Sequence, residues 1–152
     1  MRNAALSSPR SDSNPRPPEA YHLAVPAALT APRLTRDFLT SVLEVTGHPE
    51  LIDSGRVCVS DVVANVVQHA RVSSLSMDVT VDSGNGRVHV AVQDGDPARR
   101  PYLRTVGGDD ERGRGLMLVR QLSAASGVSL VWDGLDVVGK SVWFELGNDR
   151  PL

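Results

Sequence analysis

Hydrophobic residues recur at helical spacing in the first third of the chain. Between about residues 29 and 45 they are Leu34, Phe38, Leu39, Val42 and Leu43. Gly47 then supplies a stop signal. The following segment, 49–72, is rich in valine, which by propensity favours strands. Its doublets at 62–63 and 66–67 are four residues apart, which fits one stripe of a helix and no period of two. The pattern predicts two successive helices.

Period-two alternation predicts the strands. The segment 21–27, YHLAVPA, fits a short edge strand ended by Pro26. Alternating apolar residues in 75–81 and 87–94 flank the turn SGNG and predict a β-hairpin. A third helix is expected over 114–126, with inward-facing residues Leu116, Val119, Leu122 and Ala125. The segments 128–132 and 138–146 are then predicted to be two closing strands. Helices that cluster instead of alternating with strands favour an α+β fold, a two-layer sandwich of a mixed or antiparallel β-sheet with helices on one face.

The segment 95–112, GDPARRPYLRTVGGDDER, has no apolar period. It contains three arginines before Thr105 and a Gly-Gly pair. A loop longer than about 15 residues inside a compact domain is usually a functional lid or disordered. We therefore expect a lid-like loop between the hairpin and the third helix.

Composition limits the class of protein. With 152 residues and a net charge of −2, the chain suits one domain whose surface is not built mainly for nucleic acid or anionic lipid. No apolar run approaches a membrane span. We expect residues 1–20 to be a disordered Pro-rich tail, 21–147 the domain, and 148–152 a short C-terminal tail. The single cysteine, Cys58, excludes an intrachain disulfide and favours a reducing, cytoplasmic location.

One face of the valine-rich helix carries polar residues. Asp61, Asn65, Gln68 and His69 fall within about a third of its circumference, opposite the valines. This is the arrangement of a solvated outer face. The stripe has no Lys or Glu, however, and an Asp and an Asn one turn apart also suit Mg²⁺ or a positioned water. Both interpretations are open at this stage.

Two further segments have ligand-binding potential. In ERGRGLMLV, Gly113 and Gly115 precede an apolar helix, so backbone amides there can face phosphate. Arg112 and Arg114 would add positive charge. A flexible loop before a helix explains the same residues. Asp94 ends a strand, where its carboxylate can accept a hydrogen bond from a ligand amino group. Asp-Gly is equally a turn former.

The string GLDVVGKS, residues 134–141, matches the phosphate-binding pattern G-x-x-x-x-G-K-[ST]. That pattern requires a helix after the Ser or Thr. Here Val142, Phe144 and Leu146 alternate with Trp143 and Glu145, which predicts a strand. We therefore reject a P-loop.

Taken in order, DVVANVVQHA, VAVQDGDP, ERGRGLMLV and GKSVWFEL resemble the N box, G1 box, G2 box and closing strand of the Bergerat-fold (GHKL, histidine-kinase-like) ATPases, and more narrowly those of the actinobacterial anti-sigma-factor serine kinases. The resemblance spans about residues 21–146. It implies that Asp61 activates the attacking hydroxyl and that Asn65 holds Mg²⁺. The ATP-binding residues it implies are Asn65, His69, Asp94, Gly95, Arg112, Gly113, Arg114, Gly115, Leu116 and Ser141. Among these Asp94 recognises adenine, Gly113 and Gly115 line the phosphates, and Ser141 lies near the adenine.

Two positions depart from the family pattern. The acidic residue of the N box is usually Glu, and Asp61 is one methylene shorter. The shorter side chain draws the carboxylate back from the hydroxyl that it would activate. A misplacement of about 1 Å can lower a rate roughly 100-fold. The second glycine of D-x-G-x-G is also replaced, because Gly95 is followed by Asp96 and Pro97. ATP binding is thus better supported than phosphoryl transfer.

The resemblance implies a cytoplasmic, homodimeric protein serine kinase that uses ATP and Mg²⁺, sequesters a sigma factor, and phosphorylates a STAS-domain anti-anti-sigma partner, with no direct contact to nucleic acid or membrane. Two alternatives stay open. One is a catalytically weak or inactive nucleotide-binding module that acts only by binding a regulator. The other is a detached ATPase domain of a sensor kinase, against which stands the lack of a dimerisation helix pair or sensor segment in the sequence.

Overall fold

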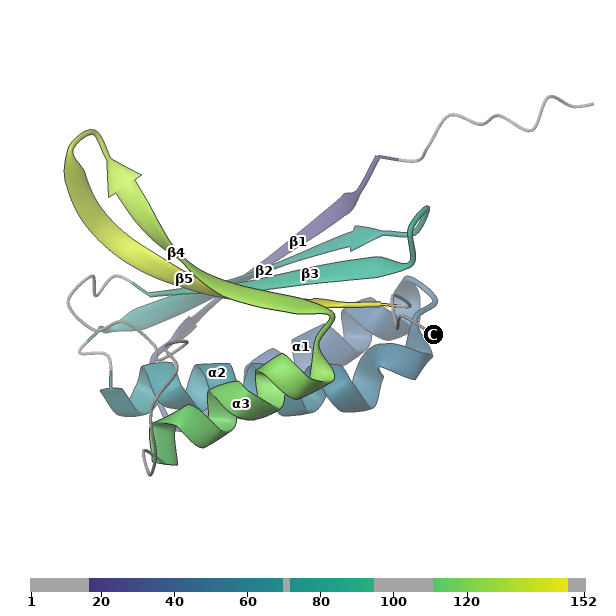
Figure 1. Ribbon diagram of the computed structural model, residues 1–152, viewed down its shortest axis with the longest axis horizontal. Helices are drawn as coiled ribbons and strands as arrows, with labels where there is room; N and C mark the ends of the chain where they lie inside the picture. Colours follow the sequence, from purple (N-terminus) through teal and green to yellow (C-terminus); the bar gives the residue numbers. More distant parts are fainter. Residues whose placement is uncertain (1–16, 70–71, 95–110, 148–152) are drawn as a thin grey trace, which may run out of the picture.

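The computed structural model describes residues 17–69, 72–94 and 111–147, which form one sheet and one layer of helices (Figure 1). In chain order the elements are β1 (Glu19–Pro26), α1 (Ala31–Val45), the short 3₁₀ helix η1 (Pro49–Leu51), α2 (Ile52–His69), β2 (Ser74–Asp82), β3 (Arg87–Asp94), α3 (Glu111–Leu122), β4 (Ala125–Asp133) and β5 (Asp136–Leu146).

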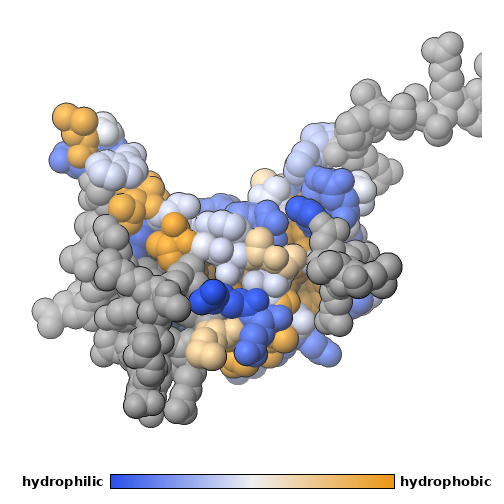
Figure 2. Space-filling view, in the orientation of Figure 1, coloured by the Kyte–Doolittle hydropathy of each residue, from blue (hydrophilic) through white to orange (hydrophobic). Residues whose placement is uncertain are grey.

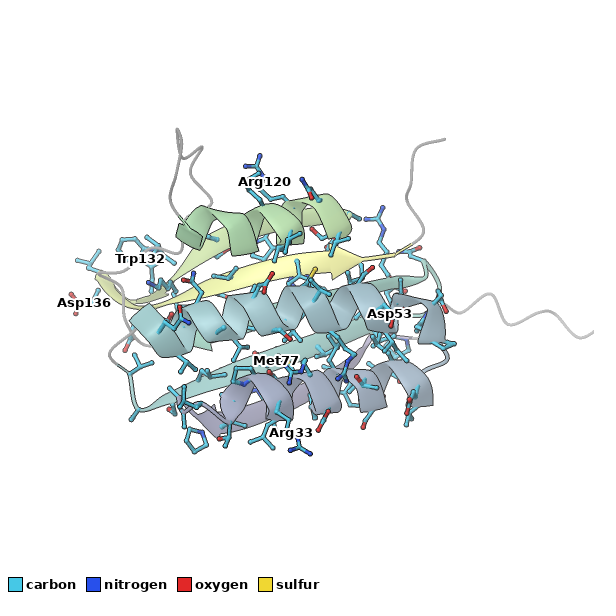
Figure 3. The ribbon with its side chains drawn as sticks, turned by 90° about the horizontal axis from the view of Figure 1, so that it is seen from below. Arg33, Asp53, Met77, Arg120, Trp132 and Asp136 are labelled. Atoms are coloured by element: carbon cyan, nitrogen blue, oxygen red, sulfur yellow. The ribbon has the colours of Figure 1, made fainter. Side chains whose placement is uncertain are left out.

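The sheet has the strand order β1-β2-β3-β5-β4. Each neighbouring pair is antiparallel, so the sheet is antiparallel and not mixed. All three helices cover the same face, with α2 between α1 and α3 (Figures 1 and 3). The α+β two-layer sandwich expected from the sequence is therefore confirmed.

The core lies between the sheet and the helices. Strand alternation directs one side of β2, β3 and β5 into it, and the valine stripe of α2 packs against these residues. Phe144, Leu39, Leu43 and Met77 are among its largest fully buried side chains. At Gly55 a Cβ would lie 3.1 Å from Leu39 Cδ2 and 3.2 Å from Leu146 Cδ1, so the bare backbone of that residue allows α2 to approach both neighbours closely.

The predicted elements are present with shifted boundaries. The two successive helices and the 75–94 hairpin are confirmed, and Gly47 has the positive φ of 83° that a stop glycine adopts. The inward residues of the third helix are partly wrong: Val119 is fully buried, but Leu122 is 41% exposed and ends the helix. Ala125 belongs to β4, which starts earlier than expected.

The string GLDVVGKS lies in the β4–β5 hairpin. Gly134 occupies the turn with a φ of 62°, and residues 136–146 continue as β5, so no helix follows. Rejection of the P-loop is therefore confirmed. The hairpin projects past the other strands (Figure 1), and its tip carries hydrophobic residues (Figure 2). Leu135, beside Gly134 of the turn, is 96% exposed.

Candidate functional site

Asp61 and Asn65, two residues of the polar stripe of α2, lie on the side of the helix that is directed toward α3. Arg56 and Ser60 bond to Thr40 and Arg36, so their side of the helix faces α1. At about 100° per residue, Asp61 and Asn65 lie on the opposite side. Because α2 lies between α1 and α3, this side is directed toward α3 (Figure 3).

Burial distinguishes the members of this stripe. Asp61 and Asn65 are half-buried, whereas Gln68 is exposed. Asp61 Oδ2 is buried and has no hydrogen-bond partner among the described residues. A buried polar atom without a partner is rare in folded proteins and often marks a functional group. The interpretation as a solvated outer face is therefore wrong for Asp61.

Burial also changes the acid–base behaviour of this region. It disfavours the charged carboxylate and raises the pKa of Asp61 above its ordinary value. One turn earlier, burial and then the negative charge of Asp61 raise the pKa of the Cys58 thiol to about 12. Cys58 is fully buried, so it serves as a small apolar group.

The Asp61–Asn65 pair has the chemistry expected for a hydroxyl or a hard cation. The Asp61 oxygen can accept a proton from a donor placed beside it, and a raised pKa makes it a stronger base near neutral pH. Among the described residues, no group of three or more His, Cys, Asp or Glu side chains is placed so that it could hold a metal ion. A Mg²⁺ ion held by the amide oxygen of Asn65 would also use oxygens of water and phosphate, as this ion commonly does.

A second pair of charged residues lies on the helix-facing side of the sheet. Asp94 ends β3 and is 4% exposed, and Lys140 on β5 is 3% exposed. The two are directly opposite each other in the β3–β5 register. Neither is without an interaction partner. Lys140 was missed as a site residue, although it shares its strand parity with Val142, Phe144 and Leu146 and this alternation already placed it on the buried face.

Ser141 is not brought to the same side. It is opposite Gln93 and Ser129, one position from Lys140, and so it faces the uncovered side of the sheet. The β5 residue that shares a face with Asp94 is Lys140. The contact of Ser141 with adenine that the resemblance implies stays a prediction.

The glycines of ERGRGLMLV lie inside α3 and not before it. The described helix begins at Glu111, so Gly113 is its third residue and Gly115 its fifth. The side chains of Arg112, Arg114, Leu116 and His69, together with Gly95 and the expected lid, lie outside the described residues.

An open antiparallel sheet covered on one face by three helices, with acidic residues on the central helix and at a strand end, defines an α+β domain and is consistent with an ATPase fold. The chain matches the histidine kinase-like ATPase domain over residues 25–136 and belongs to that family. Lys140 and Ser141 follow the matched segment. The search of curated proteins found no match. In the part of the chain that the structure describes, no helix has the length and apolarity to cross a membrane.

Proposed function

We propose that this histidine-kinase-like ATPase domain is an anti-sigma regulatory factor and protein serine kinase that binds ATP and Mg²⁺. It sequesters a sigma factor and phosphorylates a STAS-domain anti-anti-sigma protein. The observation that carries the proposal is the buried, unpartnered Oδ2 of Asp61 one helical turn from Asn65. A homodimer in the cytoplasm is part of the same proposal.

The residues have distinct roles in it. ATP supplies the phosphoryl group and Mg²⁺ the charge that neutralises it, and catalysis depends mainly on positioning. Asp61 accepts the proton of the serine hydroxyl of the partner, which suits its raised pKa. Asn65 offers the oxygen that holds the cation, and Asp94 accepts a hydrogen bond from the amino group of the base. Phosphorylation adds a charge of about −2 to the partner and drives its release.

Transfer of label from radioactive ATP to a STAS-domain partner tests the kinase activity. The wild-type protein with Mg²⁺ is expected to label the partner, and Asp61→Asn, which keeps the size of the side chain but removes the base, is expected to lose at least about 100-fold in rate. Chelation of Mg²⁺ provides a second control. An unlabelled partner with the wild-type protein excludes the kinase.

Binding of nucleotide is tested separately by isothermal titration calorimetry with Mg-ATP and Mg-ADP. Asn65→Ala is expected to weaken binding in Mg²⁺ and to have a smaller effect in its absence. Equal heats for the variant and the wild type would exclude Asn65 as the cation ligand.

One observation favours a second function, that of a nucleotide-binding module without catalysis. Asp61 is shorter than the Glu usual in the resembling kinases, and its unpartnered oxygen lies in a half-buried position. Asp61→Glu distinguishes the two functions. A rise in labelling means that the native residue lowers the rate, and no labelling by either protein, with ATP binding intact, supports the module.

A further inference from the structure

Lys140 is a buried cation in the middle of a β-sheet. Among the described residues the buried polar or charged side chains are Thr35, His48, Asp94 and Lys140. Lysine is almost never fully buried unless it is paired, because an ammonium loses its hydration there. An ordinary strand residue on this face would be apolar, as Val142, Phe144 and Leu146 are. Lys140 therefore calls for a specific role.

The register of β3 and β5 shows which residue Lys140 can act on. Lys140 is directly opposite Asp94, and side chains directly opposite on one face of an antiparallel pair have Cβ atoms about 4.5–5.5 Å apart. The neighbouring positions on this face are apolar: Val92 on β3, Val142 on β5, and Leu75 and Met77 on β2. Water is excluded from these neighbours, so a charge on either residue acts strongly on the other.

Among the side chains that the structure describes, those of the helices packed over the two strands contribute few charges to this side. The side of α2 toward the sheet consists of Gly55, Val59, Val62 and Val66, and Cys58 is the titratable group nearest to that side among the described side chains. The buried residues of α1 are Ala31, Thr35, Leu39, Val42 and Leu43, and Val119 is the buried residue of the described part of α3. Lys140 is thus the cation that the sheet places beside Asp94.

We propose that Lys140 is a positioning residue that sets the base specificity of the nucleotide site by keeping the buried Asp94 carboxylate ionised. This inference rests on the proposed binding of ATP. An ionised carboxylate is only an acceptor, so it pairs with the 6-amino group of adenine and repels the 6-oxo group of hypoxanthine. A protonated Asp94 would instead donate to the oxo group and weaken the discrimination.

The test compares ADP with inosine diphosphate, which differs at this position of the base, by isothermal titration calorimetry. Lys140→Met keeps an unbranched side chain only one atom shorter and removes the charge, and Lys140→Arg keeps the charge. We expect the preference of the wild type for ADP to fall at least about tenfold in Lys140→Met and to be largely retained in Lys140→Arg. In Lys140→Met the preference should also increase with pH, because deprotonation of Asp94 restores the acceptor.

A matched background tests whether Lys140 acts through Asp94. Asp94→Asn should abolish the preference, and adding Lys140→Met to it should change nothing further. A folded Lys140→Met protein with the preference and pH profile of the wild type would overturn the inference. If that variant does not fold, the wild type decides: its preference should stay constant between about pH 7 and 5, and a marked decline over that range counts against an ionised Asp94.

Failure of the inference is distinguishable from failure of the proposed function. Wild-type protein that binds neither ADP nor ATP removes the proposed function. In that case NMR titration of the Asp94 carboxyl carbon in ligand-free protein still tests the coupling, since Lys140→Met should move its midpoint to higher pH and Lys140→Arg should not. Equal midpoints in all three proteins would overturn the inference.

Discussion

The indole of Trp143 on β5 lies across the backbone of Gly127 on β4. A Cβ added to Gly127 would be 2.6 Å from Trp143 Cζ2 and 2.8 Å from Cε2, distances that Cβ atoms essentially never have. The register places the two residues directly opposite each other, and the ring of His89 stacks on the same indole with centroids 5.4 Å apart. This glycine therefore makes room for the indole of Trp143 on the uncovered face of the sheet.

Gly127→Ala is expected to destabilise the protein by about 1–3 kcal/mol, because the ring must move off the strand. Chemical denaturation measures the loss. In a Trp143→Leu background the cost of Gly127→Ala should become small. An equal cost in both backgrounds would show that the indole is not the cause.

Asp61→Asn is expected to stabilise the folded protein at neutral pH by about 1 kcal/mol, a modest value because the group is only half-buried. The folded pKa is raised above 3.8, so ionisation of Asp61 opposes folding. The wild type therefore loses stability as the pH rises from about 3.8 through the raised pKa, and the variant does not. The melting temperatures of the two proteins, measured from pH 3.5 to 8, should diverge as the pH rises through this window, with the variant becoming the more stable. At higher pH their difference should stay constant. Parallel curves throughout would contradict the raised pKa.

Cys58 is expected to resist thiol reagents in the native state. Its side chain is fully buried and its pKa is about 12, so very little of it is thiolate at pH 8. Labelling with a chromogenic disulfide should follow the unfolding curve in guanidinium chloride. Cys58→Ser gives the background signal, and rapid labelling without denaturant would be inconsistent with this burial.

Phe144→Ala should cost about 3–5 kcal/mol, because the ring is fully buried at the centre of the sheet and its removal leaves a cavity. Leu135→Ala is a control on the same hairpin. Leu135 is 96% exposed, and its truncation should alter the free energy of unfolding by less than about 0.5 kcal/mol. Similar costs at the two positions would contradict the assigned core.

The spacing of apolar residues predicted most of the fold. Valine favours strands, yet the doublets of α2 correctly indicated a helix, because a four-residue spacing puts all of them on one buried side. The start of β4 could not be found in this way. Ser126 and Gly127 have low strand propensity, and Gly127 is required there by Trp143, which is distant in sequence and contacts it only across the sheet.

The candidate site was predicted less completely. The acidic residues were found by type and spacing, but whether the polar side of α2 meets water or α3 depends on tertiary packing and not on the sequence of the helix. Lys140 lies in a segment that was predicted to be a strand, but it was not proposed as a site residue. Lys140 lies two residues before Val142 and four before Phe144, and this spacing already placed it on the buried face of the strand. Side chains alternate between the two faces of a strand even where one of them is a charged residue with a partner.

The strand order also bears on when the site forms during folding. β1, β2 and β3 with α1 and α2 come from the N-terminal part of the chain, and β4 and β5 form a local hairpin, so the two parts are joined along the β3–β5 pairing. Contacts between distant segments form late because they require closure of a long loop. Asp94 and Lys140 face each other across this junction. A nucleotide held there would bind only the fully assembled chain and would stabilise the pairing of its two parts. The concentration of nucleotide would then set how often β3 and β5 separate.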